Sequence, residues 1–104
     1  MTAESVYRAL LAQFADEGVV GGSLFGWKAF KLDGASLGCV KGDLAAFRLG
    51  ADNPALAAAL QLEGAHHFDP GRKDRPFKDW VAVPITHAAE LPDILAAAIE
   101  ARLR

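Results

Sequence analysis

The stretch from Leu24 to Leu49 constrains the fold most, because it holds three short apolar runs separated by two glycine-containing turns. Each run has the length and the apolar content of a β-strand. The pairs Asp33-Gly34 and Gly42-Asp43 suit the positive φ angles that tight hairpins require. This pattern predicts three antiparallel strands connected as a meander. The predicted strands are residues 24–32, 36–40 and 44–49.

Helical patterns flank this meander. Residues 2–17 carry apolar side chains three and four positions apart, and Thr2 suits the N-cap of the helix. A second helix is predicted to begin at Asn53-Pro54, since asparagine is a good cap and proline is tolerated at the first helical position. A third helix, over residues 87–103, should begin close to Pro92, because proline is tolerated only in the first turn.

Residues 80–85, WVAVPI, follow the second helix and read as a fourth strand. The order helix, three strands, helix, strand, helix is typical of the α+β class. At 104 residues, the chain has room for one domain, which we place over residues 1–104. We therefore expect an antiparallel sheet, made of a three-strand meander plus a later strand, covered by the terminal helices.

Both faces of the first predicted strand are apolar. In LFGWKAFKL, alternation places Phe25, Trp27 and Ala29 on one face and Leu24, Phe30 and Leu32 on the other. One face can lie beneath the helices. Large exposed apolar patches are rare on monomers, so the other face is expected to meet either a helix of the same chain or another subunit.

The net charge and the cysteine content indicate the cellular compartment and the classes of partner to expect. The net charge of −2 gives no overall attraction to nucleic acids or anionic lipids. The single cysteine, Cys39, cannot form an internal disulfide, which fits a reducing compartment. The first residues combine acidic groups with an amphipathic pattern, which is typical of neither a signal peptide nor a membrane span. We expect a cytoplasmic protein without a membrane partner.

The most polar stretch, AHHFDPGRKDRPFKDW, runs from Ala65 to Trp80. Neighbouring residues on an extended segment point to opposite sides, so His66 and His67 are poorly placed to share an ion. His67 and Asp69 alone are too few ligands for a stable zinc site. We interpret the stretch as a structured connection that aromatic side chains anchor to the core, and we expect no metal.

The same stretch holds a local basic cluster. Asp69, Asp74 and Asp79 offset most of its charge, and duplex binding depends mainly on phosphate neutralisation. We therefore rank nucleic-acid binding below protein binding and keep it as the alternative. The basic residues are Arg72, Lys73, Arg75 and Lys78.

No arrangement of residues predicts catalysis. Cys39 lies in the apolar run SLGCV, where burial raises the pKa of a thiol and makes it inert. The Gly21-Gly22-Ser23 segment lacks the Lys-Ser/Thr pair of a phosphate-binding loop. We expect no catalytic residue and no cofactor, with an enzyme as the second alternative.

The ordered set of motifs resembles the N-terminal domain of the TfoX/Sxy competence-regulator family, over almost the whole chain. The chain departs from the family pattern at Trp27, where a second glycine is common, and at Phe77, where methionine is common. The matching positions are Phe25, Gly26, Phe30, Gly34, Phe47, Arg48, Leu49, Gly64, Ala65, Phe68, Asp69, Pro76, Trp80, Val81, Val83 and Pro84.

This resemblance implies a stand-alone α+β domain of the secretion-chaperone-like type. The full-length regulators of the family act in transcriptional control of DNA uptake, and the isolated domain brings no activity with it. We predict a small non-enzymatic binding or regulatory domain that acts through protein–protein interaction with an unidentified partner, with homodimer formation as a further expectation. The candidate partner-binding residues are Phe25, Trp27, Arg72, Lys73, Arg75 and Lys78.

Overall fold

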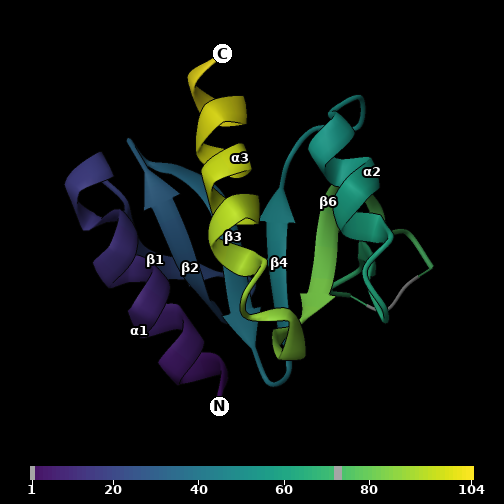
Figure 1. Ribbon diagram of the computed structural model, residues 1–104, viewed down its shortest axis with the longest axis horizontal. Coiled ribbons are helices and arrows are strands. Elements are labelled where there is room, and N and C mark those ends of the chain that lie inside the picture. Colours follow the sequence, from purple (N-terminus) through teal and green to yellow (C-terminus); the bar gives the residue numbers. More distant parts are fainter. Residues whose placement is uncertain (1, 72–73) are drawn as a thin grey trace.

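The computed structural model describes residues 2–71 and 74–104 and places three α-helices on one face of a six-stranded sheet (Figure 1). The strands lie in the order β1-β2-β3-β4-β6-β5, and every neighbouring pair is antiparallel. This confirms the predicted α+β class. The elements are α1 (Ala3–Phe14), β1 (Val20–Leu24), β2 (Trp27–Leu32), β3 (Ala35–Lys41), β4 (Leu44–Arg48), α2 (Pro54–Leu60), β5 (His66–Phe68), β6 (Phe77–Pro84) and α3 (Leu91–Leu103).

The sheet contains two strands that the sequence patterns did not predict. The run that we predicted as one strand is broken by a two-residue turn at Phe25-Gly26, with φ angles of 57° and 78°. The meander therefore has four strands, beginning with β1, rather than three. A phenylalanine with positive φ is rare, which is why propensity did not indicate this turn. Strand β5 has only three residues, too few for a periodic pattern.

The helix starts follow the predicted caps. Thr2 and Ser5 form a reciprocal capping box, in which the Ser5 N–H donates to the Thr2 hydroxyl at 3.1 Å. The Asn53 side chain accepts from the Ala55 N–H at 2.9 Å, and Pro92 lies in the first turn of α3. Helix α3 begins at Leu91, and the preceding predicted helical residues form a 3-10 turn and its connection. Over the described ranges, no helix has the length and apolarity needed to cross a bilayer.

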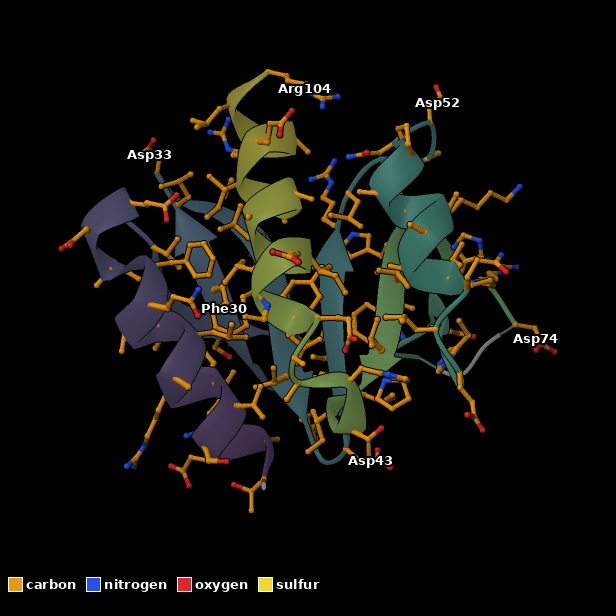
Figure 2. All side chains as sticks on the ribbon, viewed as in Figure 1. Phe30, Asp33, Asp43, Asp52, Asp74 and Arg104 are labelled. Carbon is orange, nitrogen blue, oxygen red and sulfur yellow. The ribbon has the colours of Figure 1, made fainter. Side chains whose placement is uncertain are left out.

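The larger core fills the space between the helices and the sheet, where Phe30 lies (Figure 2). Phe30, Gly38 and Phe47 occupy one row across β2, β3 and β4, and the two phenyl rings stack with their centroids 6.1 Å apart. A Cβ atom at Gly38 would overlap the carbonyl oxygen of Ala46 and lie 2.8 Å from Cδ1 of Phe47. The close approach of these strands therefore requires glycine at position 38.

We expect Gly38→Ala to lower the free energy of unfolding by about 1–3 kcal/mol, because the added methyl group must displace backbone in a packed core. Urea unfolding followed by circular dichroism measures this change. Ser36→Ala, on the same strand, is the control and should change stability by less than about 0.5 kcal/mol. Equal stability of the two variants would contradict the packing described for Gly38.

Candidate functional site

The sheet face opposite the helices carries a second apolar core. Among the described residues no helix residue belongs to it, and its larger partly buried members, Trp27 and Phe77, pack at its margin. Leu24, which alternation placed with Phe30 and Leu32, packs against this core instead, because the turn at Phe25-Gly26 interrupts the strand. Ala29 is fully buried, so our expectation of an uncovered face that needs another helix or another subunit is wrong. The buried members are Ala29, Cys39, Ala46, Phe68, Trp80 and Ala82.

Curvature of the sheet covers this face. Trp27 on β2 and Phe68 on β5 make an edge-to-face contact with their ring centroids 5.0 Å apart. Strands β3, β4 and β6 lie between β2 and β5 in the sheet order, and adjacent strands are about 4.8 Å apart. In a flat sheet the two strands would be about 19 Å apart. The sheet must therefore curl until side chains from its two ends meet.

Phe68 is the centre of the aromatic cluster, which we define as Phe25, Trp27, Phe68, Phe77 and Trp80. Besides Trp27, the ring of Phe68 lies 5.4 Å from Trp80 and 6.2 Å from both Phe25 and Phe77, measured between centroids. Its side chain is 2% exposed. The aromatic residues predicted to anchor this stretch are Phe68, Phe77 and Trp80. Phe68 and Trp80 are buried, and Phe77 is partly buried against the same core, in agreement with that role.

Phe68→Ala should cost about 3–5 kcal/mol of unfolding free energy, because it leaves a cavity where four other rings converge. Phe68→Leu should cost less, because it keeps most of the buried volume. Thermal or denaturant unfolding of both variants tests this order. A loss below about 1 kcal/mol for Phe68→Ala would show that the cluster does not hold the curled sheet closed.

Phe25 is the exposed member of the cluster. It stands at the first position of the β1–β2 turn with φ of 57°, and 52% of its surface is exposed. Asn-Gly is the favoured pair for such a turn, and a bulky residue in the left-handed region costs about 1–2 kcal/mol. The Phe25 ring is therefore held at the surface by a backbone conformation that phenylalanine disfavours.

A surface groove of about 380 Å³ lies beside Phe25 and Phe77. Three of its lining residues, Phe25, Gly71 and Arg75, are exposed, so the groove opens to solvent. Its floor is apolar, and Asp69 and Arg75 supply charged groups. The groove is lined by Phe25, Asp69, Pro70, Gly71, Arg75 and Phe77.

The structure brings together three of the residues predicted to bind a partner. Phe25 and Arg75 line the groove, and Trp27 lies half-buried in the aromatic cluster next to it. Lys78 is exposed on β6 but does not line the groove. The predicted residues Arg72 and Lys73 lie outside the described residues. The neighbouring Asp74 projects at the side of the molecule (Figure 2).

Two further basic residues, Lys28 and Arg48, have acidic partners away from the groove. The Lys28 Nζ lies 3.3 Å from a Glu4 carboxylate oxygen and 5.8 Å from the centroid of the Tyr7 ring, on the helix side of the sheet. Its hydrogen bond and charge, together with those of Arg8, lower the pKa of Glu4. The Nε of Arg48 pairs with a carboxylate oxygen at 3.1 Å, on β6. Neither residue extends a basic surface at the groove.

The three histidines direct a ring nitrogen at backbone carbonyls. His66 Nδ1 lies 3.2 Å from the Gly64 oxygen, His67 Nδ1 3.2 Å from the Trp80 oxygen, and His87 Nε2 2.8 Å from the Glu63 oxygen. Each of these nitrogens carries the proton in the bond. Within residues 2–71 and 74–104, there is no group of three or more His, Cys, Asp or Glu side chains that could hold a metal ion.

Cys39 lies in the floor of the second core. It is fully buried, and this burial raises the pKa of its thiol from the ordinary value of 9.0 to about 12. The thiolate is the reactive form of cysteine. A nucleophilic role for Cys39 therefore has no support in this environment.

We expect Cys39 to resist thiol reagents at pH 8 in the folded protein and to react fully in guanidinium chloride. Since the folded-state pKa lies above the unfolded one, the thiol's contribution to stability is present below about pH 9 and is lost as the pH rises toward 12. The wild type should therefore lose stability relative to Cys39→Ala over that range. Rapid labelling of the native protein at pH 8 would contradict the buried placement.

A second groove, of about 480 Å³, lies where α3 crosses the ends of β3 and β4. It contains the Arg48–Asp79 ion pair and the exposed Arg102. No sequence motif indicates this groove, because its residues come from four separate segments. Likewise, no sequence motif indicates that Pro70 and Gly71 line the first groove. In both cases only the packing brings the residues together.

No family model, curated protein or solved structure gives a significant match to this chain.

Proposed function

We propose that this protein is a small non-enzymatic binding domain that docks an apolar side chain of a partner protein in the groove beside Phe25 and Phe77. The observation that carries the proposal is the exposure of Phe25, at 52%, in a turn position where its φ is 57°. Strained residues at the surface are often retained for function. An aromatic side chain that stays half exposed and requires an unfavourable backbone conformation is typical of a residue that binds a partner.

The composition of the groove favours a protein partner. Aromatic residues and arginine are enriched where partner side chains insert into protein surfaces, and the groove contributes two phenylalanines and Arg75. The ring of Phe25 is braced by Phe77, 5.8 Å away between centroids, so little side-chain entropy is lost on binding.

Nucleic-acid binding through the 72–78 segment stays the alternative. Arg75 lines the same groove as two aromatic rings, a combination that also suits a stacked base. Against it, Lys28 and Arg48 are paired with carboxylates away from the groove. The chain also carries a net charge of −2, which gives no general attraction to phosphates.

Phe25→Asn separates binding from folding. Asparagine suits the left-handed turn position, so the relief of strain offsets the lost ring contacts, and stability should change by less than about 1 kcal/mol. Peptides selected from a random displayed library against the wild-type domain should bind Phe25→Asn at least about tenfold more weakly, as titration calorimetry measures. Amide shifts on titration should centre on residues 25, 75 and 77.

Leu103→Asn is the matched control, because Leu103 is another exposed large apolar residue, at 67%, and lies at the end of α3. It should leave peptide affinity unchanged. Peptides that bind both variants equally, or that shift residues elsewhere, would refute the docking site. Tight binding of a single-stranded oligonucleotide that weakens steeply with salt, with no peptide selected, would support the nucleic-acid alternative instead.

A further inference from the structure

Strand β1 is a sheet edge whose own residues provide little protection against pairing. Among the described residues it pairs only with β2, and its five residues, VGGSL, include no charge and no proline. Natural edge strands are usually guarded by charged residues, proline, a bulge, shortness or a covering helix. Here the Lys31 side chain of β2 runs beside Gly22, and Tyr7 of α1 packs against Gly21. The opposite edge, β5, has three residues and an irregular register against β6. The two edges of this sheet are therefore unequal, and β1 is the one open to pairing.

The surface of β1 is accessible along most of its length. Residues 20–23 are all exposed. Val20 is 57% exposed, and Phe25, which follows the strand directly, is 52% exposed. In the part of the chain that the structure describes, these are two of the three large apolar residues that are exposed. Exposed apolar surface thus gathers at this edge.

The turn geometry fixes which backbone groups point outward. Leu24 and Trp27 flank the two-residue turn and are register partners, and such flanking residues form a hydrogen-bonded pair. Hydrogen-bonded and non-bonded pairs alternate along antiparallel strands. The N–H and C=O groups of Gly21 and Ser23 therefore face away from β2.

We propose that β1 pairs in antiparallel register with β1 of a second copy of this chain, with the two-fold axis at Gly22. Gly21 of each copy then faces Ser23 of the other, and each of these pairs exchanges two hydrogen bonds through the outward groups. Val20 faces Leu24 of the other copy, so an apolar contact forms on either side of the axis. The two six-stranded sheets join into one continuous sheet.

Self-complementarity favours a second copy over an unrelated strand. Read in either direction, VGGSL has an apolar residue at each end and small residues between them, and it has no charge to select a different partner. At the axis the two Gly22 residues form a non-bonded pair, in which Cα atoms approach to about 4.5 Å. A Cβ at Gly22 would already lie 2.8 Å from the Lys31 side chain. The flexible Lys31 side chain can swing aside in each copy, so the axis at Gly22 can close.

Sedimentation equilibrium from about 10 to 500 µM tests this pairing, because an edge-strand dimer of modest area dissociates on dilution. The wild type should approach twice its monomer mass of 11.0 kDa. Ser23→Pro should return it to monomer, because proline removes an outward donor and leaves the ladder with β2 intact. Ser23→Thr is the matched control and should remain dimeric.

A wild type that stays monomeric at the highest concentration would overturn the proposal. A Ser23→Pro variant that is folded by circular dichroism and still dimeric would do the same. Should Ser23→Pro not fold, Val20→Lys replaces it, since residue 20 is exposed and a lysine guards an edge against pairing. Phe25→Asn keeps β1 intact and should remain dimeric, so failure of the docking groove and failure of the edge pairing are separate results.

Disulfide trapping tests the register. Gly22→Cys should cross-link on mild oxidation, because the paired Cα atoms, about 4.5 Å apart, lie within disulfide range. Val20→Cys should not cross-link, because position 20 faces position 24 of the other copy. Cys39 is fully buried and does not compete. Faster cross-linking at position 20 than at position 22 would overturn the two-fold axis proposed here.

Discussion

The contact between Trp27 and Phe68 is the interaction on which both faces of the sheet depend. It joins β2, next to one edge, to β5 at the other edge. Because the curled face leaves little depth, its floor is built from small side chains, and the partly buried rings of Trp27 and Phe77 stand at its margin. That floor consists of Ala29, Cys39, Ala46 and Ala82. A flat sheet of the same strands would leave this floor in water, where it would need a separate covering element.

The sequence correctly predicted the turns and helix starts that depend on one or two neighbouring residues. The Asp33-Gly34 turn has the positive φ angles expected of it, 51° and 82°, and Thr2 and Asn53 cap their helices as their side-chain chemistry indicates. The β1 strand was not predicted because its turn uses Phe25, a residue whose intrinsic preference opposes that conformation. Tertiary contacts of the Phe25 ring outweigh its preference for negative φ. Such contacts cannot be recognised from the local sequence.

The candidate site was predicted in part, for a reason that was itself incorrect. Alternation placed Phe25 and Trp27 on the face away from the helices, and both residues do belong to the aromatic cluster. That prediction nevertheless assumed one straight strand and an open face, whereas the groove exists because the curled sheet brings Phe77 and Pro70 to Phe25. Residues so far apart in the chain have no common periodicity, so only packing could assign them to one surface.

The long stretch of chain between Trp27 and Phe68 also sets the order in which the strands pair during folding. Strands β1 to β4 pair with neighbours along the chain, so their hairpins close short loops. Trp27 meets Phe68 only after β6 has paired with β4 and β5 has paired with β6. Contacts that close long loops form late, because the entropy cost of closing the loop comes before the stabilising contact is made. During synthesis the small-residue floor, which includes Ala82 on β6, therefore stays in contact with water until the nascent chain extends past β6.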